Sequence, residues 1–167
     1  MTRPYTIIGI DPGISGAIAL VEVDGPFLTL VDLWDVPTYK HTANRKRIME
    51  PNLGEIFQNL EDEWVRQAYI ERVHAMPKQG TASTFAFGMA VGLLRGAAAT
   101  AGIPVRDMTP TQWKRAMGLR GDKDAARGMA VNLFPSRASD FERKKDIDRA
   151  EAALIAVAGH KMNGEFT

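Results

Sequence analysis

The segment that most constrains the fold is YTIIGIDPGISGAIAL, at residues 5–20. Its isoleucine-rich first half is typical of a buried strand, and that strand ends in a carboxylate, Asp11. Proline and glycine then turn the chain, and a second apolar run, residues 17–23, leads back beside the first. A charge at the end of a buried strand needs a compensating partner, usually a metal ion or a donor-rich loop. The alternative is a solvated aspartate that opens a Pro-Gly turn.

The 167 residues predict a single domain, residues 1–160, with a frayed tail at 161–167. The chain has no cysteine, so any metal must be bound by oxygen or imidazole. The net charge of +1 gives no support to non-specific binding of polyanions. We find no apolar run approaching the ~20 residues that span a bilayer, and the start, MTRPYT, lacks the apolar core of a signal peptide. We therefore expect a cytoplasmic protein with no membrane partner.

The rest of the chain adds strands and helices in an order that indicates the fold class. Residues 27–36 read as a third strand, in which strict alternation would place Leu28, Leu30 and Trp34 on one face, and two short turns make the first three strands an antiparallel meander. Two shorter strands follow, each after a helix and so parallel to the first. The expected later elements are helices at 51–64, 81–101, 110–117, 123–134 and 146–160 and strands at 68–73 and 104–108. This order predicts an α/β fold with a mixed five-stranded sheet flanked by helices, which matches the ribonuclease H arrangement.

The cations gather in segments that could hold phosphates. One is the polar stretch 37–50, which is either a solvated loop or a phosphate-binding loop. Another is the pair of short helices at 110–134 and the turn between them. The candidate DNA-binding residues are Lys40, Arg45, Lys46, Arg47, Lys78, Lys114, Arg115, Arg120 and Lys123.

Acidic residues in three places could form one site. Glu71 stands inside the short strand at 68–73, where a carboxylate is costly unless something binds it. In the last helix Asp148 and Glu151 are three residues apart and share a face, and Asp146 points elsewhere if it is helical. At the N-cap, however, Asp146 would escape that angle and could also reach a metal, so either aspartate could be the ligand. A solvated helix face is the simplest explanation of that pair taken alone. Four acids in one place, with Asp11, are best explained by Mg²⁺ or Mn²⁺ ions bound by oxygen.

The helix at 81–101 carries three glycines, Gly88, Gly92 and Gly96, on one face at four-residue spacing. Each glycine costs ~1 kcal/mol of helix propensity relative to alanine. Close approach of another backbone would compensate for this cost. That neighbour is either the sheet or a second subunit.

Three motifs together resemble the RuvC family of Holliday-junction resolvases. They are IxGIDPGxxG at the N-terminus, the acid in IERV, and DxxEA in the last helix. STFAFGMAVGLLRGAA at 83–98 and PTQWKRAMGLRGDKDAARGM at 110–129 are also similar to family segments. The ordered set covers residues 5–160, so nearly the whole chain takes part in the resemblance.

The resemblance implies a nuclease that cuts four-way DNA junctions with two Mg²⁺ ions, for which Mn²⁺ substitutes. It implies that Asp11, Glu71, Asp148 and Glu151 bind the metal, and that Lys114 and the catalytic Lys123 lie near the scissile phosphate and the DNA backbone. Such ion pairs, ~4 Å apart, stabilise both the attacking water and the leaving oxygen. Symmetrical cutting of a junction requires two sites, so a homodimer is expected. The chain departs from the family pattern at Trp113, which replaces an aliphatic residue before the lysine.

Three alternatives stay open at this point. The same chemistry could act on forks, flaps or RNA–DNA hybrids. A junction-binding protein without catalysis would explain the basic segments but not the four acids. An actin-like phosphotransferase also has a D-x-G hairpin, but it needs two such domains and this chain holds one.

Overall fold

The computed structural model describes residues 3–60, 64–72, 74, 80–120 and 123–164. Its main sheet has five strands in the order β3-β2-β1-β6-β7. The antiparallel part consists of β1 (Tyr5–Asp11), β2 (Ala17–Asp24) and β3 (Phe27–Asp35). The parallel part adds β6 (Val65–Glu71) beside β1 and β7 (Val105–Met108) beside β6. The expected mixed sheet is confirmed.

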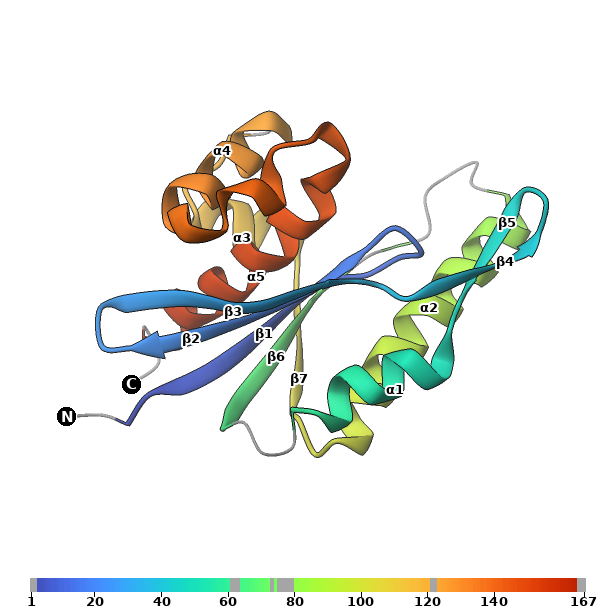
Figure 1. Ribbon diagram of the computed structural model, residues 1–167, viewed down its shortest axis with the longest axis horizontal. Helices are drawn as coiled ribbons and strands as arrows, with labels where there is room; N and C mark the ends of the chain where they lie inside the picture. Colours follow the sequence, from blue (N-terminus) through green and yellow to red (C-terminus); the bar gives the residue numbers. More distant parts are fainter. Residues whose placement is uncertain (1–2, 61–63, 73, 75–79, 121–122, 165–167) are drawn as a thin grey trace.

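Helices cover both faces of this sheet (Figure 1). One face carries α1 (Glu50–Gln58) and α2 (Thr81–Thr100). The other face carries α3 (Pro110–Ala116), α4 (Lys123–Leu133) and α5 (Ile147–Gly164). Between α4 and α5 the chain forms two 3-10 turns, η1 (Pro135–Phe141) and η2 (Lys144–Asp146). Because successive residues of β1 face opposite sides, Ile7 belongs to the core under α5, and Ile8 and Ile10 to the core under α1 and α2. Each face therefore has its own apolar core.

The helix α5 packs unusually close to the central strand. A Cβ atom at Gly9 of β1 would overlap the carbonyl oxygen of Ala152 and lie 2.5 Å from the backbone nitrogen of Ala156. Farther along α5, Gly159 leaves room for the ring of Tyr69 from β6. Gly9 of β1 and Gly159 of α5 are thus what allow the helix to lie this close to β1 and β6. The helix runs past His160 to Gly164, and residues 165–167 of the expected frayed tail lie outside the described residues.

A β-bulge in β3 changes which of its side chains share a face. Leu20 of β2 pairs with Asp32, but the next residue, Val21, pairs with Leu30, so one residue of β3 is extra. As a result Leu28, Leu30 and Leu33 pack in the core under α5, whereas Trp34 packs in the core under α1 and α2. The expectation that Leu28, Leu30 and Trp34 share a face is wrong, because it assumed an unbroken alternation.

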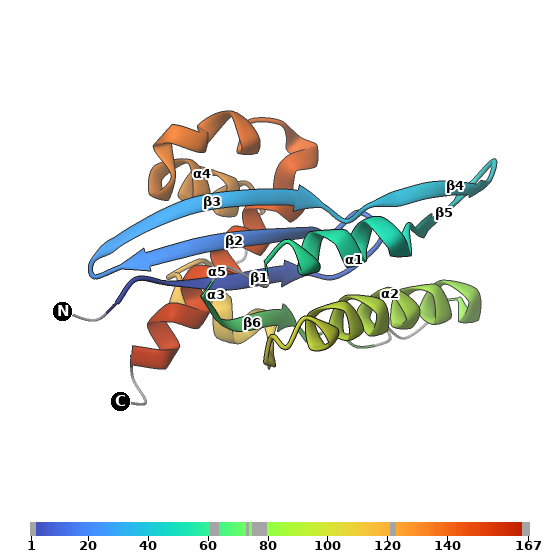
Figure 2. The ribbon, with the colours of Figure 1, turned by 60° about the horizontal axis from the view of Figure 1, so that its bottom comes forward.

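The basic segment 37–50 is a paired β-hairpin rather than a loop. Its strands are β4 (Thr38–Thr42) and β5 (Arg45–Ile48), which form a separate two-stranded sheet. The hairpin continues from β3 and extends beyond the main sheet, on the same side as the N-terminal half of α2 (Figure 2). Hairpin and helix border a cleft of about 490 Å³, with cationic side chains on the hairpin side and Phe85 and Met89 on the helix side.

The glycine face of α2 is exposed. A Cβ atom at Gly88, Gly92 or Gly96 would meet nothing within 4 Å, because the buried side of α2 is formed by other residues, Ala90, Leu94 and Ala98. The sheet is therefore not the neighbour of the glycine face, which corrects the first of the two expectations. Phe85 is 70% exposed and Met89 41% exposed on the same helix.

Contrary to the expectation from the sequence, α2 is long and apolar enough to cross a membrane when judged by length and composition alone. It is the one such helix among the described residues, and a single helix of this kind is weak evidence for a membrane span.

Candidate active site

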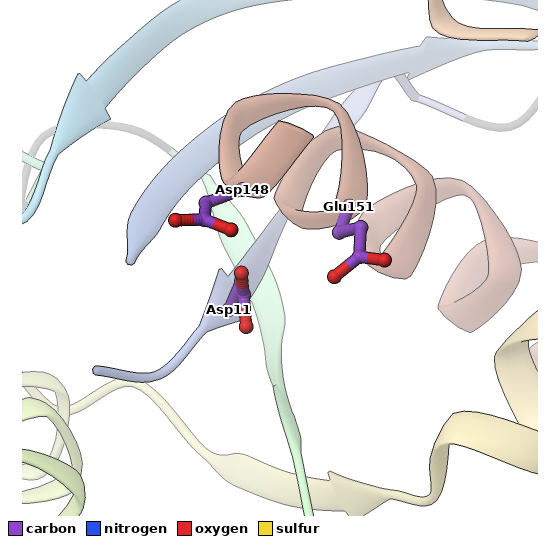
Figure 3. Close-up of side chains that lie close together, drawn as sticks. All are labelled: Asp11, Asp148 and Glu151. Carbon is purple, nitrogen blue, oxygen red and sulfur yellow. The ribbon is translucent and has the colours of Figure 1, made fainter. Parts of the chain in front are cut away.

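Three carboxylates meet where β1 ends and α5 begins. Asp11 is the last residue of β1, and Asp148 and Glu151 lie on the first turns of α5. One oxygen from each lies within 4.8 Å of the others, and Figure 3 shows Asp11 facing the two acids of the helix. Asp11 is buried and the other two are half-buried. The grouping expected from helical spacing is confirmed.

The turn after β1 fixes the position of Asp11. Gly13 has a φ of 144°, which side chains other than glycine rarely adopt, and its carbonyl accepts a 3.2 Å hydrogen bond from the nitrogen of Gly16. A Cβ atom at Gly16 would overlap the carbonyl oxygen of Asp11. These two glycines allow the chain to fold back tightly and leave the Asp11 carboxylate facing α5.

The site is strongly unfavourable for a lone anion. Burial raises the pKa of Asp11 well above its ordinary value, and the charges of Asp148, Glu151 and Glu71 raise it further, while Lys114 lowers it. A bound cation would compensate for this repulsion. All the donors are carboxylate oxygens, and such a donor set suits a hard divalent cation such as Mg²⁺ or Mn²⁺. The residues present therefore fit a divalent metal ion.

Glu71 stands apart from the group of three. It is the last residue of β6, not a mid-strand residue as expected, and it is half-buried. Its charge acts on Asp11, but the described oxygens that lie within 4.8 Å of one another do not include those of Glu71. Its Oε2 instead accepts a 2.6 Å hydrogen bond from the indole Nε1 of Trp113. No sequence pattern indicated this bond, because residues 71 and 113 lie on different elements.

Asp146 has a structural role at the start of α5. It is buried, and the guanidinium of Arg143 donates to both of its carboxylate oxygens, at 2.8–3.1 Å. The backbone nitrogen of Arg143 donates to the same carboxylate at 2.9 Å. These bonds from Arg143 hold the pKa of Asp146 below its ordinary value. Asp146 is thus bound to Arg143, while Asp148 belongs to the acidic cluster.

A second ion pair joins α5 to the edge of the sheet. Arg149 donates from Nε and from its terminal nitrogen to the two oxygens of Asp35, at 2.6 and 2.7 Å, and these bonds hold the pKa of Asp35 below its ordinary value. Arg149 lies between Asp148 and Glu151 in the sequence. The pair therefore ties the acid-bearing turn of α5 to the end of β3.

The structure divides the candidate DNA-binding residues among separate places. Exposed cations lie on the hairpin, and others lie on or just after α3, where Lys114 is half-buried and near enough to Asp11 to lower its pKa. Lys123 is the first residue of α4. Lys78 lies outside the described residues. The exposed candidates are Lys40, Arg45, Lys46, Arg47, Arg115 and Arg120.

Comparison with known proteins identifies the family. No family model matches the sequence. The chain is 30% identical over 163 residues to the crossover junction endodeoxyribonuclease RuvC of Desulfitobacterium hafniense, covering 94% of this chain and 93% of that protein. It is 35% identical over 125 residues to the RuvC of Nitratidesulfovibrio vulgaris, covering 70% of this chain and 69% of that protein.

The fold agrees with these relatives. The structure of T. thermophilus RuvC in complex with a Holliday junction substrate superposes with a TM-score of 0.65 at 20% identity, covering 95% of this chain and 96% of that chain. The fowlpox virus Holliday junction resolvase superposes with a TM-score of 0.50 at 16% identity, covering 95% and 99%. The fold is therefore ribonuclease H-like, as expected. The chain belongs to the RuvC family of crossover junction endodeoxyribonucleases, as its motifs indicated.

Proposed function

We propose that this protein is a structure-selective endonuclease that resolves four-way DNA junctions by metal-dependent hydrolysis of phosphodiesters. The observation that carries the proposal is the group of three carboxylates at the end of the central strand, with oxygens within 4.8 Å of one another. Relatives that match nearly the whole chain are named crossover junction endodeoxyribonucleases, which supports the same activity here.

The acids of the cluster would hold Mg²⁺, with Mn²⁺ as a substitute. Asp11, the last residue of β1, would be the ligand shared by two ions, and Asp148, Glu151 and Glu71 would complete their coordination. Two divalent ions in such a site stabilise both the attacking and the leaving oxygen of a phosphodiester. Lys114 adds a positive charge beside Asp11, where a scissile phosphate would lie. The burial of Asp11 keeps bulk water from screening these charges.

The exposed cations would hold the arms of the junction through phosphate contacts. The hairpin supports this role because it extends beyond the sheet and carries its cations on exposed positions. α3 and α4 lie on the opposite face of the sheet from α2, and their cations, with Arg120 between the two helices, would form a second contact region; of these, Lys114 acts on Asp11. Two separate contact regions suit a branched substrate better than a single duplex.

We also propose a homodimer formed through the glycine face of α2. That face is exposed, and exposed Phe85 and Met89 lie on the same helix. Glycines at four-residue spacing let two helices approach closely, and apolar contacts beside them would stabilise the pair. A two-fold dimer would supply the two sites that paired cuts require. The expected cytoplasmic location stays a prediction.

Incubation of the purified protein with labelled four-way junction, fork, flap and RNA–DNA hybrid substrates tests the proposal. With Mg²⁺ or Mn²⁺ the junction should be cut into paired nicked duplexes, and excess chelator should abolish cutting but not binding. Preferred cutting of forks or flaps would move the protein to another branched substrate of the same chemistry. Junction binding without cutting in any metal would leave only a binding function.

A further inference from the structure

We infer that Trp113 is a positioning residue for the active site: its indole holds the carboxylate of Glu71 on its N–H edge and the ammonium group of Lys114 over its ring face. Trp113 is fully buried, and its Nε1 donates to Oε2 of Glu71 at 2.6 Å. The Nζ atom of Lys114 lies 5.1 Å from the ring centroid, within range of a cation–π interaction. The side chain of Trp113 therefore contacts both the carboxylate of Glu71 and the ammonium group of Lys114.

The path of the chain makes the indole a fixed support. Glu71 at the end of β6 pairs with Met108 at the end of β7, and Arg72 donates its backbone N–H to the carbonyl of Met108 at 2.8 Å. The helix α3 begins directly afterwards, with Thr109 as its cap. Trp113 is thus separated from the strand partner of Glu71 by a single capped turn of helix.

The cap itself is a reciprocal pair of hydrogen bonds. The nitrogen of Gln112 donates to Oγ1 of Thr109 at 3.2 Å, and the nitrogen of Thr109 donates to Oε1 of Gln112 at 2.8 Å. This closed cap holds the first turn of α3, and Trp113 follows it immediately. The indole cannot move without breaking the cap or opening the core that buries it.

Glu71 benefits from such a support. It is half-buried at the end of its strand, and a glutamate side chain has three rotatable bonds to fix before it can bind an ion. The indole N–H of Trp113 donates to Oε2 of Glu71, and the second acceptor of this carboxylate is Oε1. Partners that orient a ligand in this way typically contribute a factor of about 10–100 to metal affinity.

The inference rests on the proposed function only in that the acids must bind a divalent cation. The test uses the full chain without DNA and Mn²⁺ as the probe, with binding measured by the decrease of the free Mn²⁺ signal in electron paramagnetic resonance. The variant Trp113→Phe keeps an aromatic face toward Lys114 but removes the N–H donor and part of the buried ring volume. We expect it to bind Mn²⁺ about tenfold more weakly than the wild type.

A double-mutant cycle separates positioning from a general effect on the fold. In a Glu71→Gln background, Trp113→Phe should cause no further decrease in Mn²⁺ affinity, because the group it acts through no longer carries a charge. Wild-type affinity in Trp113→Phe, or an equal decrease in both backgrounds, would overturn the inference. Absence of Mn²⁺ binding by the wild type would instead overturn the proposed metal site itself.

A nuclear magnetic resonance measurement keeps the inference testable even if the core does not tolerate phenylalanine. The indole N–H signal of Trp113 can be assigned as the one tryptophan side-chain signal that remains in the spectra of both the Trp34→Phe and the Trp64→Phe proteins. Glu71→Gln should move this signal, and Mg²⁺ added to the wild type should move it as well. A signal that responds to neither change would mean that Trp113 only fills the core.

Discussion

Replacing Gly9 by alanine tests the close packing that brings the acids together. The added methyl group would lie 2.5 Å from the nitrogen of Ala156, and closer still to the carbonyl oxygen of Ala152. Ordinary van der Waals contact begins at 3.4 Å, so relieving the contact with Ala156 alone requires α5 to move away from β1 by about 0.9 Å, the difference between 3.4 and 2.5 Å, and the closer contact with Ala152 requires more. Both clashes are with backbone atoms, which cannot rotate aside as a side chain could.

The expected cost follows from this displacement. Overpacking of a core typically costs about 1–3 kcal/mol, and each kcal/mol lowers the Tm of a domain of this size by roughly 2–4 °C. We therefore expect Tm to fall by about 2–12 °C. The same shift separates Asp148 and Glu151 from Asp11, and a misplacement of ~1 Å can lower the rate of catalysis by ~10²-fold.

The assay combines a melting curve in chelator with single-turnover cleavage of a four-way junction, measured well below the lowered Tm. Gly54→Ala on α1 is the matched control, because a Cβ atom there would meet nothing within 4 Å. It should gain up to ~1 kcal/mol from helix propensity and cut at the wild-type rate. A Gly9→Ala protein with unchanged Tm and unchanged rate would refute the account of how α5 presents its acids.

Three further predictions concern charge, assembly and pH. Replacing the hairpin cations Arg45, Lys46 and Arg47 with alanine should weaken junction binding. The salt dependence of binding should flatten by ~0.9 in log–log slope for each phosphate that is no longer neutralised. An unchanged slope would mean that the hairpin is merely solvated. Gly92→Leu should give a folded monomer by light scattering that makes one nick without its pair, whereas a stable dimer would move the interface elsewhere. The raised pKa of Asp11 means that its contribution to stability is fully present below the ordinary pKa of 3.8 and is lost as pH rises through the folded-state pKa. Asp11→Asn should therefore raise Tm in chelator at neutral pH and remove this part of the pH dependence, and a lower Tm would contradict the electrostatic account.

Much of the fold could be predicted because its signals are local and periodic. The apolar run of β1, the turn after Asp11 and the spacing of Asp148 and Glu151 each follow from a few neighbouring residues. The cluster of Asp11, Asp148 and Glu151 could therefore be predicted from the sequence. Helical spacing favours Asp148 over Asp146, but an aspartate at the N-cap escapes that spacing, and only the structure shows Asp146 bound to Arg143 in the turn before α5.

The features that could not be predicted depend on interactions between distant residues. The bulge in β3 shifts Leu33 and Trp34 to new faces, and nothing in the strand itself marks the extra residue. The hairpin at 38–48 is too polar to show a buried face, so its pairing leaves no hydrophobic pattern. The bond from Trp113 to Glu71 depends on the register of β7 against β6, which no local pattern specifies.

Two aspartates that lie two positions apart, Asp146 and Asp148, provide the sharpest test of the active-site assignment. Asp148→Asn keeps the shape of the side chain but removes a charge from the cluster, and Asp146→Asn weakens the ion pair with Arg143 at the start of α5. Single-turnover cleavage of a labelled four-way junction in Mg²⁺ is measured for both, with junction binding in Ca²⁺ and Tm as controls. We expect Asp148→Asn to bind the junction with wild-type affinity without cutting it, and Asp146→Asn to melt at a lower temperature but still cut. A folded Asp146→Asn protein that cannot cut, beside an Asp148→Asn protein that cuts at the wild-type rate, would contradict the assignment of the active site.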